Sequence, residues 1–342
     1  MLSEREAKIL NIIVEYYIKK GEPVGSSFLA SHYSEKGKFL SSATIRNIFK
    51  KMEEKELIEK THLSSGRIPT KKGLKVYLEN LINDFKSKGD KIDKSFTQKI
   101  NILAGRDLIS NLETYAEILE KETGVVSLLL LPDLFTTKIK RIDFVQLSPE
   151  KILAIIVSVN DFYRETILEM PYPVNYQQLI AAANYINMNF SGLTLFEIKK
   201  RLLNSIESGL NQLNNVAKNI VKLAYENIDR IYGEENSIII KGLSNILDER
   251  YVKEVRVLKS LMENFEKKKD IYHLITSCIN KELAFNLDFP AENFSLIVSS
   301  YSVVGGGKGA FGLVGPLRMN YKRNISIMRQ ITHSIIEQLF VK

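Results

Sequence analysis

The sequence has a single cysteine, Cys278, so no intrachain disulfide can form. Cys278 lies between Ile275 and Ile279 in an apolar stretch, where a catalytic thiol would lack the base and the electropositive surroundings that it needs. A small core residue is the favoured interpretation. None of the four histidines pairs with another His or Cys at ligand spacing. We therefore predict no catalytic residue, no cofactor, no metal site and no enzymatic activity.

Long apolar runs are also missing. The longest, Val125–Pro132 and Ile152–Val159, are the length of strands, whereas a membrane span needs about 18 apolar residues. The first ten residues, MLSEREAKIL, carry charges where a signal peptide has its apolar core. These absences predict a cytoplasmic protein with no membrane partner.

A glycine-rich segment, Gly307–Gly312, matches the pattern G-x-G-x-x-G. A dinucleotide site requires this pattern between a strand and an immediate helix, but both flanks here have strand character. Lys308 precedes Gly309 rather than Ser or Thr, so the segment is not a phosphate loop either. A flexible hairpin is favoured over a nucleotide-binding enzyme.

The length of 342 residues predicts two or three domains. The net charge of +8 is unevenly distributed, because residues 1–90 carry 17 Lys and Arg against 12 Asp and Glu. A basic surplus in one small region is typical of a polyanion partner, although many basic domains bind none.

Three short helices are predicted at the N-terminus. Ser3 and Glu6 form a capping box for the first, which ends near Gly21, and Ser26 or Ser27 opens the second. The third begins at Ser41 or Ser42, and its helical periodicity places Ile45, Ile48, Phe49 and Met52 on one face.

The opposite face of the third helix is small at its start and then polar and basic. Asn can bond adenine and Arg can bond guanine bidentately, while Lys can reach phosphates. The alternative is a solvated amphipathic helix, for which outer charges are routine. The predicted DNA-binding residues of this segment are Ser41, Ser42, Ala43, Thr44, Arg46, Asn47, Lys50 and Lys51.

A short hairpin, or wing, is predicted after the third helix, and a fourth helix starts at Thr70. Hydroxyls, a glycine and an arginine at the wing tip suit contact with phosphates or the minor groove. Gly66 is expected in a backbone conformation that is hard for other residues. The predicted DNA-binding residues of the wing are His62, Ser64, Ser65, Gly66 and Arg67. The order of elements is that of a winged helix-turn-helix domain.

Three blocks carry a specific resemblance: Gly21–Ser26, Ser41–Asn47 and Ser64–Thr70. In this order and spacing the sequence resembles the HrcA family of heat-inducible transcription repressors, and Gly315–Tyr321 is similar to the C-terminal signature of that family. The resemblance implies a homodimer that binds double-stranded DNA at an inverted-repeat CIRCE-type operator before chaperone operons. It also implies a GroEL-type chaperonin as modulator and a GAF-like domain that carries an inserted dimerisation segment.

The remaining chain predicts an α+β fold. Four strand-like runs between Val125 and Met170 and further strands after Ser237 are expected to form one antiparallel sheet with flanking helices, consistent with a GAF-like fold. The mainly helical stretch Leu195–Ile231 has an aliphatic stripe that could pack internally or against a partner chain. The expected domains are a winged-helix domain at 1–88, a GAF-like domain at 89–190 and 236–342, and an inserted dimerisation segment at 191–235.

The leading hypothesis for function is a sequence-specific repressor of heat-shock operons. The alternative is a small-molecule-responsive GAF-type regulator of other genes, which polar residues converging inside the sheet would favour.

Overall fold

The computed structural model describes residues 2–35, 40–61, 66–88, 108–133, 136–208, 218–222, 226, 237–247, 255–291 and 293–340. The chain divides into two compact units. The first unites residues 1–91 with two later segments, 285–297 and 314–327. The second contains residues 92–284, 298–313 and 328–342.

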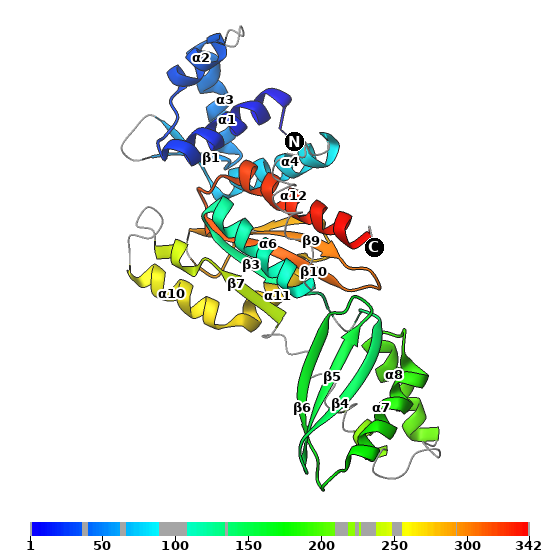
Figure 1. The fold of residues 1–342 in the computed structure, drawn as a ribbon. Coiled ribbons are helices and arrows are strands. Elements are labelled where there is room, and N and C mark those ends of the chain that lie inside the picture. Colours follow the sequence, from blue (N-terminus) through cyan, green and yellow to red (C-terminus); the bar gives the residue numbers. More distant parts are fainter. Residues whose placement is uncertain are drawn as a thin grey trace. The chain divides into compact units, whose positions relative to one another are not determined.

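The first 88 residues form the winged helix-turn-helix order that the sequence predicts (Figure 1). The elements are α1 (Glu4–Lys20), α2 (Ser26–Glu35), α3 (Ser42–Glu54), β1 (Ile58–Lys60), β2 (Arg67–Pro69) and α4 (Lys71–Lys88). Both expected ends of α1 are confirmed. Ser3 and Glu6 cap its start reciprocally, and Gly21 ends it in the left-handed conformation with φ 74°.

A five-stranded sheet has the strand order β7-β3-β10-β9-β8. Its strands are β3 (Val126–Leu130), β7 (Ile238–Lys241), β8 (Leu283–Asn286), β9 (Phe294–Ser302) and β10 (Lys308–Pro316). Every residue of β3 is buried, as expected for a strand covered on both faces. The helix α6 (Leu108–Thr123) packs against β3 and β7.

Helices complete this part of the chain. On α12 (Tyr321–Phe340), the Thr332 hydroxyl lies 3.4 Å from the Ser299 hydroxyl of β9, so α12 packs on that strand. The others are the 3-10 helix η2 (Leu243–Leu247), α10 (Val255–Glu266) and α11 (Lys268–Cys278). Cys278, expected in the core, is only partly buried because it ends α11.

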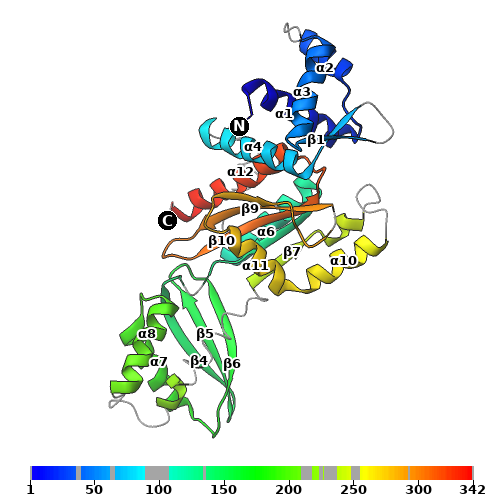
Figure 2. The same cartoon turned by 180° about the vertical axis from the view of Figure 1, so that it is seen from behind.

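Among the described residues, a second sheet consists of β4 (Ile139–Ser148), β5 (Lys151–Ser158) and β6 (Tyr163–Glu169), all antiparallel. The expectation of one sheet for all the strands was therefore wrong. Two helices follow, α7 (Tyr176–Phe190) and α8 (Leu195–Ser208). Both lie on the same side of this sheet (Figures 1 and 2), and α7 packs against β4.

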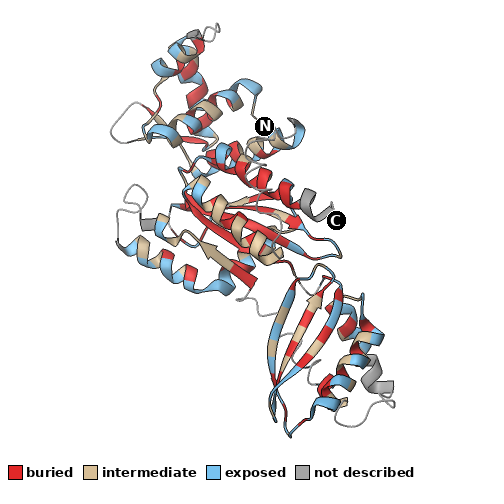
Figure 3. Ribbon diagram, in the orientation of Figure 1, coloured by how far each residue is buried: buried red, intermediate tan, exposed pale blue. Residues whose placement is uncertain are grey.

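Burial alternates along β5 and β6, as the colours in Figure 3 show. Ile152, Ala154 and Ile156 of β5 are buried, whereas Leu153 and Ile155 between them are only partly covered. Alternation of this kind marks a sheet with one packed face and one open face. Within the described ranges, no helix is both long and apolar enough to cross a membrane.

Candidate nucleic-acid interface

The start of α3 is fixed by hydroxyl groups. Ser41 is its N-cap, and the Ser41 Oγ accepts a hydrogen bond from the backbone N of Thr44 at 3.1 Å. The hydroxyls of Ser41 and Thr44 also lie 2.9 Å apart. Ser42 Oγ lies 2.9 Å from Ser26 Oγ at the start of α2. These bonds hold the two helices of the helix-turn-helix together at the ends where their backbone N–H groups are unpaired.

The two faces of α3 separate as the periodicity predicts. Ile45, Ile48, Phe49 and Met52 are buried, and the opposite face is exposed. Asp and Glu are absent from the sequence between Ser41 and Met52, so the charges on this part of the face, Arg46, Lys50 and Lys51, are all positive. The exposed residues among those predicted to bind DNA on this helix are Ser41, Ala43, Arg46, Asn47, Lys50 and Lys51.

Arg46 has a contact that the sequence did not reveal. Its Nε donates to Ser26 Oγ at 3.4 Å, and the same oxygen lies beside Ser42 Oγ. Ser26 thus positions the guanidinium over the start of α3. The only signal for this role was the place of Ser26 in the block Gly21–Ser26, because the partner comes from 20 residues further along the chain.

The wing is a two-stranded hairpin in which Ile58 faces Pro69 and Lys60 faces Arg67. Val24 extends it through an antiparallel bridge to Arg67. Three residues predicted to bind DNA from the wing, His62, Ser64 and Ser65, lie outside the described residues.

Arg67 does not lie at the wing tip, so that expectation was wrong. It opens β2, and its Nε donates to Glu53 Oε1 at 2.8 Å. Its guanidinium also lies 5.2 Å from the centre of the Phe49 ring, and only 13% of its side chain is exposed. Glu53 and Phe49 both belong to α3, so Arg67 fastens the base of the wing to that helix.

Gly66 is needed for a reason other than the expected one. Its φ is not in the left-handed region. A Cβ at Gly66 would instead lie 2.6 Å from Pro23 Cβ and 3.0 Å from the Pro23 carbonyl carbon. The residue is a glycine because the two backbones approach closely here.

An ion pair joins α1 to the end of α3, since Lys55 Nζ lies 3.0 Å from Glu6 Oε2. Glu6 also accepts from the backbone N of Ser3 at 2.8 Å. The Ser3 hydrogen bond and then the Lys55 ammonium lower the pKa of Glu6 below its usual value. Within the described residues, no three His, Cys, Asp or Glu gather as a metal-binding group.

The chain is similar to known proteins over most of its length. The family described as HrcA protein C terminal domain matches residues 110–325, and the Ribonuclease R winged-helix domain matches residues 7–77. The heat-inducible transcription repressor HrcA of Halalkalibacterium halodurans is 28% identical over 99% of this chain and 98% of its own. That of Ruminiclostridium cellulolyticum is 29% identical over 99% and 98%.

A solved structure supports the fold. A crystal structure of a hypothetical protein superposes with a TM-score of 0.63 at 22% identity, covering 100% of this chain and 99% of the other. The HrcA C-terminal domain accounts for more than half of the sequence, and the N-terminal segment before it folds as a winged helix. This chain therefore belongs to the HrcA family.

Proposed function

We propose that this protein is a transcription repressor that binds double-stranded DNA in a sequence-specific manner through α3. The observation that carries the proposal is the exposed face of α3 on a winged-helix fold, where Arg46, Lys50 and Lys51 come before the first acidic residue of the helix, Glu53. A helix of this kind enters the major groove and places its N-terminal residues on base edges. The names of the curated relatives, heat-inducible transcription repressor HrcA, support the same role.

In this proposal, some residues of α3 contact bases and others contact phosphates. Arg46 and Asn47 provide the two bidentate side chains suited to guanine and adenine. Ala43 is small enough to let the helix approach the floor of the groove. Lys50 and Lys51 bind phosphates. Ser41, Ser42 and Thr44 surround the helix N-terminus, where unpaired N–H groups favour a phosphate.

The wing contributes a second contact through His62, Ser64 and Ser65, directed at the backbone or the minor groove. Arg67 supports this contact indirectly. Its contacts with Glu53 and Phe49 hold the start of β2, at the base of the wing, against α3. Gly66 allows the backbone at the base of the wing to pass close to Pro23.

The operator is an inverted repeat of the CIRCE type before chaperone operons, and a GroEL-type chaperonin sets the amount of active repressor. Apolar strands such as β3 are aggregation-prone when they are exposed in a partly folded chain, so a chaperonin has a surface to capture. During heat shock, unfolded proteins occupy the chaperonin and the operons are released.

A two-fold operator requires a two-fold protein, and the open face of the β4-β5-β6 sheet supports a homodimer. Val145, Leu153 and Ile167 form one row across the three strands. Val145 is 45% and Ile167 is 56% exposed, and neighbouring exposed apolar residues of this kind form a patch that marks an interaction site. Much of the stripe expected to hold the dimer, including Leu210 and Leu213, lies outside the described residues.

The test is a gel shift of the full chain on an inverted-repeat operator, with a scrambled duplex as control. We expect specific binding that rises when GroEL is added and falls again when a denatured competitor is added. Equal affinity for both duplexes would contradict sequence-specific repression, and binding indifferent to both additions would remove the chaperonin from the proposal.

A further inference from the structure

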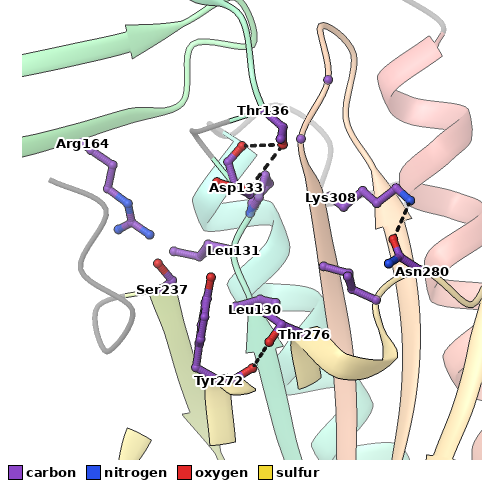
Figure 4. Close-up of a pocket in the computed structure, with 14 residues that line it drawn as sticks. Leu130, Leu131, Asp133, Thr136, Arg164, Ser237, Tyr272, Thr276, Asn280 and Lys308 are labelled. Carbon is purple, nitrogen blue, oxygen red and sulfur yellow. Dashed lines mark hydrogen bonds between the residues drawn. The ribbon is translucent and has the colours of Figure 1, made fainter. Parts of the chain in front are cut away.

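The second unit contains a cavity of about 540 Å³ (Figure 4). Cavities of this size commonly hold small molecules. Its wall comes from the end of β3, the start of β6, the helix α11 and the β9–β10 hairpin. The apolar part of the lining consists mainly of Leu130, Leu131, Pro132, Tyr272 and Ile279.

Arg164 brings a positive charge to this cavity. Figure 4 shows its guanidinium on the same side as Ser237 and Leu131. The side chain lies over the Phe162 ring, 5.1 Å from its centre. Burial lowers the pKa of the Arg164 guanidinium. Among the described residues, no ion pair to this guanidinium is found, so the charge is suited to an incoming anion.

Lys308 supplies a second cation on the opposite side of the cavity in Figure 4. Its ammonium donates to the amide oxygen of Asn280 at 3.5 Å, a neutral partner. Asp133 also lines the cavity, and its carboxylate accepts from Thr136 Oγ1 at 3.4 Å. Two cations against one carboxylate leave the charged lining positive.

The glycine-rich hairpin forms one wall by close contact with the chain after β3. Gly306 and Gly307 have φ values of 95° and 84°, which favour glycine. A Cβ at Gly306 would lie 2.3 Å from the Thr136 carbonyl oxygen, and one at Gly307 would lie 2.1 Å from Thr137 Oγ1. The backbone N of Asp133 donates to the Lys308 carbonyl at 3.1 Å. Gly306 and Gly307 are therefore glycines because the hairpin packs closely against the chain after β3, where the two segments form this wall of the cavity.

We propose that this cavity binds a small organic carboxylate with an apolar body, whose carboxylate is received by Arg164 and whose apolar part lies against Leu130, Leu131 and Tyr272. The planar guanidinium matches a carboxylate with two parallel hydrogen bonds, and the mainly apolar lining disfavours a highly charged ligand. This is a ligand site on the repressor that is separate from its DNA-binding surface.

The test uses naphthalene-2-carboxylate and the matching naphthalene-2-carboxamide as probes, titrated into the full chain by calorimetry. We expect one saturable carboxylate site per chain and about tenfold weaker binding of the amide. Arg164→Gln should raise the carboxylate Kd about tenfold and leave the amide unchanged. Arg141→Gln is the matched control, because Arg141 lies on β4 and pairs with Asp143 at 3.0 Å outside the cavity.

Two further variants protect the test from a folding defect. Arg164→Lys keeps the charge but loses the bidentate geometry, so it should restore only part of the affinity that Arg164→Gln loses. Lys308→Gln changes an exposed side chain and should weaken the carboxylate alone. Equal affinity for the two probes, equal effects of Arg164→Gln and Arg141→Gln, or no saturation at about 1 mM would each overturn the proposal. Operator binding is measured in a separate assay, so a failure of the proposed DNA binding would not change the affinities measured for the two probes.

Discussion

Arg46 and Asn47 are adjacent on the exposed face of α3, yet Lys50, one turn further along, should act differently. In the proposed binding mode, replacing Arg46 or Asn47 by Ala would remove one bidentate base contact. We expect a loss of about 1–3 kcal/mol in operator binding and relaxed preference at one base pair. Competition assays with single-position operator variants measure both effects.

Lys50→Ala is the matched control for these variants. Loss of a phosphate contact should weaken binding to all sequences alike and reduce the salt dependence by about one counterion. If Arg46→Ala and Asn47→Ala leave base preference unchanged while Lys50→Ala behaves as expected, α3 binds DNA in another orientation.

Gly66→Val should destabilise the winged-helix domain by about 1–3 kcal/mol, because the new side chain would overlap Pro23. Gly25→Ala is the control in the same segment, since a Cβ there would meet only Ser27 Oγ at 3.7 Å. Urea unfolding of both variants measures the difference. Equal stabilities would contradict the close approach as the reason for glycine at position 66.

Individual residues show where a prediction from the sequence succeeds and where it fails. The two faces of α3 were predictable because helical periodicity alone separates Ile45 from Arg46. The position of Arg67 was not, because its partner Glu53 lies 14 residues earlier and only the folded wing brings them together. Gly66 was identified correctly as special, but glycines needed for space and for positive φ look identical in a sequence.

The stabilisation that the Glu6 carboxylate of α1 gives to the folded state depends on pH. Because the pKa of Glu6 is lowered in the folded state, its stabilisation is complete above the unfolded pKa of about 4.3 and is lost as the pH falls through the lower folded value. Glu6→Gln keeps the capping box and removes the charge. We expect a loss of roughly 0.5–1 kcal/mol at pH 7 that shrinks as the pH is lowered below the unfolded pKa.

Chemical denaturation at pH 7, 5 and 3 measures this trend. Glu4→Gln is a control in the same turn, since its side chain is 84% exposed and pairs with Lys8 only at the surface. A Glu6→Gln defect that persists undiminished at pH 3 would point to lost packing instead of lost charge.

The C-terminal segment Gly315–Tyr321 gains a structural role within the first unit. The guanidinium of Arg318 lies 5.3 Å from the centre of the Tyr17 ring near the end of α1. The same group occupies the space beside Gly21. Arg318→Ala should lower the stability of this unit by about 0.5–1 kcal/mol. Lys322→Ala, a change at an exposed residue of α12, should have no effect in the same thermal melt.

At the scale of elements, nearly every strand and helix was predictable, but the pairing of strands was not. The apolar run Ile152–Val159 predicts a strand. It does not say which strands are its neighbours, because β3 and β4 are consecutive in the chain and yet belong to different sheets. The predicted insertion at 191–235 stays a prediction. We propose that it begins earlier, near Thr137, because β4, β5 and β6 already lie outside the five-stranded sheet.

At the scale of the whole molecule, the proposed dimer forms through the open face of the β4-β5-β6 sheet and matches the two-fold symmetry of the operator. A row of exposed and half-buried aliphatic residues on β4, β5 and β6 would be stabilised by a second copy of the same face, because a two-fold axis matches a patch with itself. Charges at the border are compatible with this arrangement, since Arg141 and Asp143 already pair with each other. Burying the row therefore removes apolar surface from water without leaving those two charges unpaired.

Val145→Lys together with Ile167→Lys should convert the dimer to a monomer, because two ammonium groups per chain would be buried without partners at the interface. Met188→Lys is the control, a change at an apolar residue of α7 that is 86% exposed. Light scattering after gel filtration gives the mass, and a gel shift on whole and half operators gives the consequence. The double variant should bind each half-site weakly and lose the preference for the inverted repeat. A double variant that stays dimeric would move the interface to the Leu195–Ile231 stretch, where Leu210→Lys with Leu213→Lys would then be the decisive pair.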